Sequence, residues 1–476
     1  MNRTRTASGP LVDHRLPPAP EDSTPMAPRH PNVRLRALTH EAGWSGAALA
    51  RAVNRAGAEI GLTLRYDRTS VAHWMAGTRP PASVAGVVAE ALARQLGRPL
   101  RLADIGLAPE ASERVPAVAA RPALVDLAEL DTVQPRTRPY RLGSPEPAPT
   151  APHPLGAPPP ARGASGAHRR RAPEPAGGPT AGRTAERVTL AHVRDARNML
   201  RTFTAVDCAY GGGHSRAALT GFLRSGVAEW LAATAAPRTR RELLLVASEL
   251  TRLAGSMCHD EQRHGVAQGY YQAAARLSAE ADDAQGQAAA LCALSAQAHE
   301  LGHRDHALTL AEAATCHRSR LPAWLAAAVA GQLAVAAAGR GERHRALTLL
   351  DRSAELLGRA KPEGDYHRAA HEHHQSEVLS ALGDRTGAVA ALRRSVRLRP
   401  QEERRARATG NARLAELLLD GGALEPACAA WHAFLDDWPL LRSARADRAA
   451  RTLRSRLRPF DTTAPGRSVL ARLQPR

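Results

Sequence analysis

The stretch Leu382-Gly-Asp-Arg-Thr-Gly-Ala388 places a glycine five residues before a small alanine, and this spacing recurs along the C-terminal half of the chain. The pairs are Gly302 with Ala307, Gly341 with Ala346, Gly383 with Ala388 and Gly422 with Ala427, and a further copy has Ala267 with Gln262 in place of the glycine. Successive alanines are 40, 39, 42 and 39 residues apart. This period predicts a solenoid of helix pairs rather than one globular core.

Each small residue has a physical role in such a pair. The glycine ends the first helix by adopting a left-handed conformation, and the alanine lets the second helix approach closely. The remaining positions resemble the tetratricopeptide repeat. Matching residues are Ala415, Leu418, Gly422, Ala427, Trp431, Phe434 and Pro439 in the last copy, Ser376, Leu379, Gly383, Ala388, Leu392, Ser395 and Pro400 in the preceding one, and Gly255, Cys258, Ala267, Tyr271 and Ala274 in the first. The period is longer than the 34 residues of that family, and Phe434 stands where a small residue is usual.

Composition divides the 476 residues into five zones. We predict a disordered tail at 1–29, a folded domain at 30–107, a linker rich in Pro, Gly and Arg at 108–185, the helical repeats at 186–460 and a second disordered tail at 461–476. The linker cannot bury enough apolar surface to offset its chain entropy. Within it, residues 123–130 are a candidate docking helix. A degenerate capping pair is expected between Val188 and Trp230. The predicted fold class is all-α.

The folded zone at 30–107 shows helical spacing throughout. Two runs point apolar residues inward at mostly three- and four-residue intervals: Val33, Leu35 and Leu38, then Leu49, Ala52 and Val53. Ser45 is a good N-cap for the second helix. A third helix starts near Thr69, carries Val71 and Trp74 toward the core, and leaves Ser70 and His73 to face outward. Gly77 ends it, and Pro80-Pro81 opens a fourth helix.

This arrangement resembles the Xre family of helix-turn-helix regulators. The resemblance is carried by Leu35-Arg36-Ala37-Leu38, Gly43-Trp44-Ser45, Leu49-Ala50, Val71-x-x-Trp74 and Gly77-x-Arg79-Pro80-Pro81. It implies that the helix from Thr69 to Met75 enters the major groove of DNA. The whole chain is also similar to actinobacterial regulators that join an Xre-like domain to tetratricopeptide-like repeats and influence development and secondary metabolism. In one departure, the connection from Asn54 to Arg68 is longer than that family's turn.

The candidate DNA-binding residues lie on or beside the third helix. Hydroxyl and imidazole groups can contact base edges or phosphates, and arginines beside the helix suit phosphate contacts. The set is Arg65, Arg68, Thr69, Ser70, His73 and Arg79. Ordinary solvated positions are the alternative for all of them. Trp44 and Trp74 are predicted to anchor the core rather than to stack on bases.

Charge and cysteine content favour an intracellular protein with a polyanionic partner. The formal net charge is +19 and almost all of it is arginine, with Lys361 the single lysine. Part of that excess is typical of a GC-rich genome. The five cysteines form no Cys-x-x-Cys pair, which suits a reducing compartment. No signal peptide and no membrane span is expected. We therefore expect a cytoplasmic, nucleoid-associated location and no membrane partner.

Two motifs invite an enzymatic or metal-binding interpretation. His367, His371 and His374 share one helix face, a geometry that can hold a transition metal. They lack the His-Glu-x-x-His order and start a repeat helix, where exposed histidines are common, so metal binding is left open as the lesser alternative. Gly211-Gly-Gly213-His214 lacks the Lys-Ser/Thr of a phosphate loop and predicts an interhelix turn. We expect no enzyme activity and no cofactor.

The C-terminal stretch from Arg442 to Arg458 carries seven arginines over an apolar stripe. It predicts a helix that caps the solenoid with a solvated face, and a second contact with nucleic acid or a membrane surface is the alternative.

The predicted function is a sequence-specific transcriptional regulator that binds double-stranded DNA. Its repeats bind a protein, peptide or small effector, and the chain is a possible homodimer on two half-sites. One alternative is a helical-repeat adaptor without DNA binding. Another is a scaffold that binds RNA or an anionic membrane through bulk arginine charge.

Overall fold

The computed structural model describes residues 30–60, 62–107, 139–142, 187–316, 318–359 and 365–473. These residues form helices and no strands, apart from an isolated β-bridge between Val188 and Ala235. The all-α prediction is therefore confirmed for the described residues. The predicted tail at 1–29, the candidate helix at 123–130 and most of the predicted linker lie outside them. No helix in the described ranges is long and apolar enough to span a bilayer.

The N-terminal domain has a hydrophobic core of its own, separate from that of the repeats. Its helices are α1 (Val33–Glu41), α2 (Gly46–Glu59), α3 (Arg68–Met75) and α4 (Ala82–Leu96). As predicted, Ser45 caps α2, with its side chain accepting a hydrogen bond from the Ala48 amide. Pro81 stands immediately before α4. The apolar stripes of these helices meet in one core because their spacing keeps one face of each helix inward.

The long connection before α3 is partly helical. The sequence placed it from Asn54 to Arg68, but α2 continues to Glu59 and α3 already begins at Arg68. The Asn54 side chain fixes the remainder, since its amide donates to the Tyr66 carbonyl at 2.8 Å and its oxygen accepts from the Tyr66 amide at 3.0 Å. The connection is thus tied to α2 through a residue within that helix.

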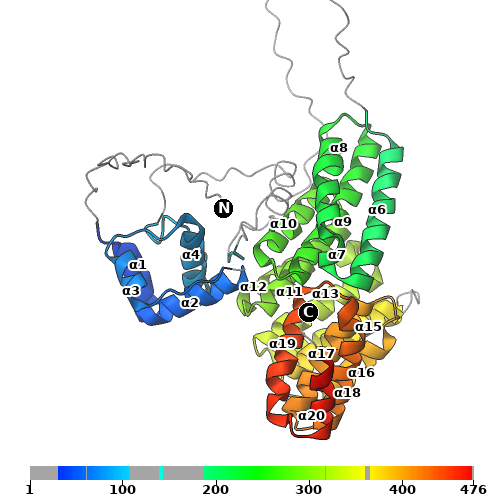
Figure 1. The fold of residues 1–476 in the computed structure, drawn as a ribbon. Helices are drawn as coiled ribbons and strands as arrows, with labels where there is room; N and C mark the ends of the chain where they lie inside the picture. The colour runs from blue at the N-terminus through cyan, green and yellow to red at the C-terminus, as the bar shows by residue number, and fades with distance from the viewer. Residues whose placement is uncertain are drawn as a thin grey trace, which may run out of the picture.

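The repeat domain is built from helix pairs that follow one another along the chain (Figure 1). Its α-helices are α6 (Leu190–Tyr210), α7 (Gly212–Phe222), α8 (Ala228–Ala232), α9 (Pro237–Asp260), α10 (His264–Glu280), α11 (Ala284–Glu300), α12 (Arg304–Ala313), α13 (Ala323–Gly339), α14 (Arg343–Arg359), α15 (Asp365–Ala381), α16 (Arg385–Leu398), α17 (Arg404–Asp420), α18 (Leu424–Asp437), α19 (Ala444–Leu457) and α20 (Ala464–Arg472). The π-helix Leu223–Val227 joins α7 to α8.

The glycine and alanine positions behave as the sequence predicts. Gly302, Gly341, Gly383 and Gly422 have φ between 77° and 86°, in the left-handed region, and each follows the first helix of a pair. In the copy that lacks the glycine, Gln262 adopts φ of 60°. The five alanines are completely buried: Ala267, Ala307, Ala346, Ala388 and Ala427. A larger side chain at any of these alanines would push its helix pair apart.

The C-terminal end differs from the predicted tail. Residues 464–472 form α20, whose Val469 is buried in the same core as Leu453 and Leu457 of α19. Thr463 caps α20, and Gly466 packs so closely against the Phe460 carbonyl that a side chain there would collide with it. The tail prediction is wrong over this stretch because its few apolar residues fit an existing core. The predicted helix at 442–458 is confirmed, with its apolar stripe buried.

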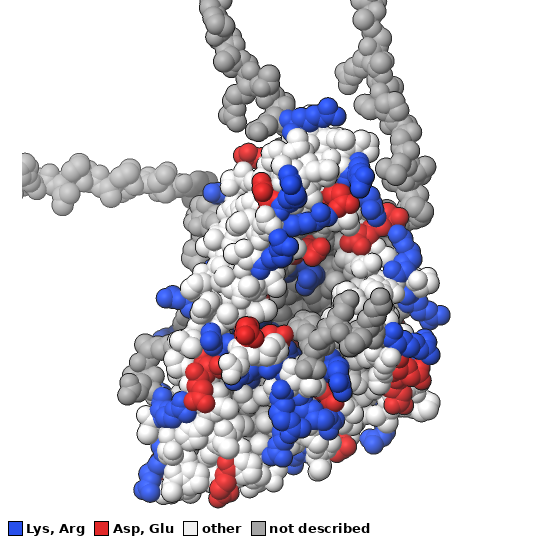
Figure 2. Space-filling model, turned by 90° about the vertical axis from the view of Figure 1, so that its right-hand side faces the viewer, with Lys and Arg blue, Asp and Glu red and all other residues white. Residues whose placement is uncertain are grey.

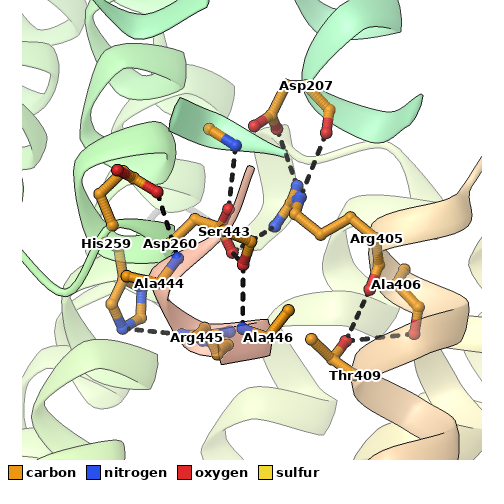
Figure 3. Close-up of polar contacts among 12 residues, drawn as sticks. Asp207, His259, Asp260, Arg405, Ala406, Thr409, Ser443, Ala444, Arg445 and Ala446 are labelled. Carbon is orange, nitrogen blue, oxygen red and sulfur yellow. Dashed lines mark hydrogen bonds and ion pairs between the residues drawn. The ribbon is translucent and has the colours of Figure 1, made fainter. Parts of the chain in front are cut away.

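The two ends of the repeat domain are joined by buried polar contacts (Figure 3). The guanidinium of Arg405 on α17 lies 2.7 Å from a carboxylate oxygen of Asp207 on α6 and 3.9 Å from one of Asp260 on α9. Asp260 also accepts hydrogen bonds from the Gly212 amide and the Ser443 hydroxyl. We call these five residues the end-to-end network.

The glycine run at the start of α7 allows this closure. As predicted, Gly211 forms the turn between α6 and α7, with φ of 84°. A side chain at Gly212 would collide with the backbone of Met257, and the Gly213 amide donates to the Arg442 carbonyl at 2.9 Å. The run therefore serves close backbone approach rather than phosphate binding.

The N-terminal domain meets the repeat domain through α4 and the short segment Pro139–Leu142. Glu90 on α4 is buried and accepts hydrogen bonds from the Arg94 side chain and the Leu142 amide. Tyr140 is completely buried in the core of the repeat domain. The prediction of disorder across 108–185 is therefore wrong at this segment, because Tyr140 is buried against the repeats.

Removing the Arg405 side chain should destabilise the repeat domain strongly. We expect Arg405→Ala to lower its free energy of unfolding by about 3–5 kcal/mol, because Asp207 and Asp260 would remain buried without their cation. Urea denaturation followed by far-ultraviolet circular dichroism measures this. Arg397→Ala, at an exposed position of α16, is the matched control and should change little. Equal stability of the two variants would contradict the role of the end-to-end network.

The interface at Glu90 should depend on pH. Burial raises the pKa of Glu90 from 4.5 to about 7, while Arg94 and the Leu142 amide oppose the rise and the Glu59 carboxylate adds to it. The neighbouring His303 is kept neutral, because burial lowers its pKa to about 3. Glu90 therefore keeps a proton when it is buried at the interface and loses it when it is exposed to solvent. Raising the pH from 5 to 8 should for this reason weaken the contact between the N-terminal domain and the repeats. A ¹³C titration of the Glu90 carboxyl should have its midpoint near 7, whereas a midpoint near 4.5 would contradict this burial.

Candidate nucleic-acid interface

Helix α3 is held in the N-terminal domain by one apolar face. Val71 and Trp74 are buried, and the Trp74 ring meets the Tyr66 ring edge-on at a centroid distance of 4.9 Å. The Asn32 amide, just before α1, donates to the Met75 carbonyl at the end of α3 at 2.9 Å. The predicted core roles hold, since Trp74 is buried and Trp44 is half-buried against the same core. These contacts fix which side of α3 faces outward.

The start of α3 is set by a residue that the sequence analysis did not single out. Asp67 is the N-cap, and its carboxylate accepts hydrogen bonds from the Ser70 amide and hydroxyl, both at 2.8 Å. These bonds to Ser70 lower the pKa of Asp67. The helix therefore starts at Arg68, one residue earlier than expected. An aspartate four residues before a buried valine is the capping signal that could have located it.

Ser70 differs from the other candidates because its hydroxyl is already used. It forms the second half of a capping box with Asp67 and is half-buried, rather than facing freely outward as predicted. A base contact by Ser70 would have to share this hydroxyl with the cap. Ser70 thus helps to cap the N-terminal end of α3.

The remaining candidates form an exposed basic surface. Arg65, Arg68, Thr69, His73 and Arg79 are exposed, and their side chains make no ion pair or hydrogen bond with other described residues. Arg68 and His73 belong to α3 itself, whereas Arg65 precedes it and Arg79 follows it. In Figure 1, α3 lies on the side of the N-terminal domain away from the repeat domain. This surface can therefore approach a large ligand without interference from the repeats.

The carboxylates of residues 30–107 have partners of their own, so they do not neutralise the arginines of this surface. Glu59 and Glu90 both pair with Arg94, and Glu41 pairs with Arg98. Asp67 and Asp104 accept backbone hydrogen bonds instead. Among the described residues, the exposed arginines of this domain without a carboxylate partner are Arg34, Arg36, Arg51, Arg55, Arg65, Arg68, Arg79 and Arg101. The spare positive charge thus spreads beyond α3.

Sequence reasoning missed Arg51 and Arg55. They stand four residues apart on α2, opposite its buried face. In helix-turn-helix proteins the helix before the recognition helix crosses the DNA backbone. The i and i+4 spacing of two arginines on the polar face of the predicted helix was the available signal.

The three histidines of α15 do not form a common site. The His367 ring stacks on Trp324 at a centroid distance of 4.9 Å, whereas His371 lies 3.0 Å from the Ser353 hydroxyl. His374 packs against Gly331, and burial lowers its pKa to about 3. The expectation of exposed histidines is wrong, because all three are half-buried. In the part of the chain that the structure describes, no group of three or more His, Cys, Asp or Glu residues could hold a metal ion.

A family model described as the SP15 N-terminal domain matches residues 35–108, a stretch that runs from α1 past α4 and leaves the repeats uncovered. No curated protein matches the chain.

The capping box should govern the order of the first turn of α3. We expect amide hydrogen exchange in α3 to become several-fold faster in Asp67→Ala, because the Ser70 amide loses its acceptor and the first turn frays. Mass spectrometry of α3 peptides from the full chain measures the rate. His73→Ala is the control, since its exposed ring has no partner among the described residues, and exchange in that variant should stay unchanged. Unaltered exchange in Asp67→Ala would argue against the cap.

Proposed function

We propose that the chain is a sequence-specific transcriptional regulator that binds double-stranded DNA through its N-terminal domain. The observation that supports this most directly is the two-sided character of α3. One side is fixed in the core by Val71 and Trp74, while the other exposes an arginine, a threonine and a histidine whose side chains have no partner among the described residues. A helix held in this way after α2 has the arrangement of a recognition helix in a helix-turn-helix unit.

The exposed residues contribute to DNA binding in different ways. The arginines neutralise phosphates and give most of the affinity, which makes binding salt-dependent. Thr69 and His73 carry hydrogen-bonding groups suited to base edges. Arg68, at the first position of α3, contacts a phosphate beside these residues. Ser70 contributes by holding the start of the helix.

The charge pattern of the repeat domain supports a localised DNA contact rather than coating by bulk charge. Figure 2 shows arginines and carboxylates interspersed on the face that it draws. Arginines of the repeats pair with nearby carboxylates, as in Arg345 with Glu312 at 2.6 Å and Arg394 with Glu372 at 2.9 Å. Much of the positive charge of the repeats is thereby compensated locally.

The repeat domain, in this proposal, serves partner recognition. Stacked helix pairs offer an extended surface for a protein or peptide, and such a surface suits control of an attached DNA-binding domain. A homodimer on two half-sites, a nucleoid-associated location in the cytoplasm and a role in development or secondary metabolism belong to the same proposal. They follow from the resemblance to Xre-like regulators.

Loss of two arginines beside the recognition helix should weaken DNA binding through electrostatics. We expect the slope of log K against log salt to fall by about two units in Arg68→Ala/Arg79→Ala, because each lost phosphate contact removes about 0.9. Fluorescence anisotropy with a mixed-sequence duplex between 50 and 200 mM salt measures the slope, the salt range being about that over which such contacts lose most affinity.

The matched control removes the same charge elsewhere. Arg393→Ala/Arg397→Ala takes two exposed arginines from α16 of the repeat domain, and the slope should stay close to that of the unaltered chain. If both double variants lower the slope equally, the chain binds DNA by bulk charge. If neither does, the basic surface at α3 does not contact the duplex.

A further inference from the structure

The segment Pro139–Leu142 occupies a site on the repeat domain. Tyr140 is completely buried, and its ring stacks on that of His303 with a centroid distance of 5.0 Å and an angle of 6° between the planes. The His306 ring meets it edge-on at 6.5 Å. His303 precedes α12 and His306 lies in its first turn. The start of α12 thus provides an aromatic pocket for one tyrosine ring.

The same site binds the backbone of the segment. Gln268 on α10 accepts a hydrogen bond from the Arg141 amide at 3.0 Å, and its own amide donates to the Arg141 carbonyl at 2.8 Å. Gln268 is buried, so both bonds form in a site shielded from water. A glutamine that bonds to both backbone groups of one residue recognises an extended peptide whatever the side chain of that residue. Backbone bonds combined with a side-chain pocket are typical of peptide recognition.

The far end of the segment contacts the N-terminal domain. The Leu142 amide donates to Glu90 of α4 at 3.1 Å, and the imidazole of His303 lies 4.0 Å from the same carboxylate. Gly86, one turn earlier on α4, faces Pro139 and Arg141, where even a methyl group would come into van der Waals contact. The segment therefore lies between the two domains and bonds to both.

We propose that Gln268, His303 and His306 form a peptide-binding site of the repeat domain, that its occupant is this chain's own Pro139–Leu142, and that its occupation fixes the N-terminal domain to the repeats. The inference does not depend on DNA binding. Because the segment is covalently tethered to both domains, its effective concentration at the site is high, and a single ring with two backbone bonds suffices to hold it. The site sets the direction in which α3 faces relative to the repeats.

Rotational diffusion of the full chain tests this attachment. Nitrogen-15 relaxation should give the amides of residues 33–96 the slow tumbling of the whole 50.7 kDa molecule. In Tyr140→Ala the correlation time of these amides should shorten at least twofold, while amides of the repeats change little. Tyr210→Ala, at an exposed tyrosine on α6, is the matched control and should leave both domains coupled. Independent tumbling in the unaltered chain, or none in Tyr140→Ala, would overturn the proposal.

A second pair of variants tests the site from the repeat side. Gln268→Leu removes both backbone bonds but keeps an apolar side chain in the core, and it should uncouple the domains as Tyr140→Ala does. A synthetic peptide with the sequence of residues 136–145 should bind the Tyr140→Ala chain at millimolar concentration, because the pocket is then vacant. It should not bind the Tyr140→Ala/Gln268→Leu chain. Equal binding to both, or to neither, would show that Gln268 and the aromatic pocket do not form a peptide site.

Discussion

Close approach of paired helices at a fully buried alanine is the constraint on which the rest of the structure depends. Ala267, Ala307, Ala346, Ala388 and Ala427 are the points where the second helix of each pair meets the first. The stacked pairs together bring α17 and the start of α19 against α6 and α9. The end-to-end network then joins the two ends through Arg405 and its carboxylates. An array packed through small side chains is thus stabilised by a few buried charges.

The N-terminal domain is attached to this array of packed helices. Gln268 lies on α10 and His303 stands at the N-cap of α12 in the next repeat, so the packing of these helices fixes their relative position. The segment Pro139–Leu142 contacts both residues and also Glu90, so it fixes the position of α4 relative to the repeats. Since α3 packs in the same core as α4, the orientation of the exposed basic surface follows from the repeats. A ligand that altered the repeats near α10 and α12 would therefore act on the direction in which α3 is presented.

Much of this architecture could be predicted from the sequence because it depends on local, periodic signals. The glycine at each pair turn and the alanine five residues later were visible, and even the irregular copy behaves alike, since Gln262 adopts the left-handed conformation. The outward position of His73 followed from the three-residue spacing of Val71 and Trp74. Such features need only the geometry of one helix or one turn.

Other features depend on contacts between distant residues, and no spacing rule reveals them. Arg405 and Asp207 are 198 residues apart, and only the stacking of the whole array brings them together. Tyr140 lies in a proline-rich stretch without periodicity, so its burial depends on a pocket that the repeats create. Ser70 was misjudged because the same residue type suits both a base contact and a helix cap, and only the position of Asp67 decides between them.

Selection from a pool of random duplexes by the full chain tests the central claim most directly, namely that the exposed side of α3 recognises a DNA sequence. Repeated rounds at about 150 mM salt should enrich a defined motif, which the chain then protects from nuclease as one discrete footprint. A pool that stays random after selection, whether the chain binds every duplex equally or none at all, would contradict it.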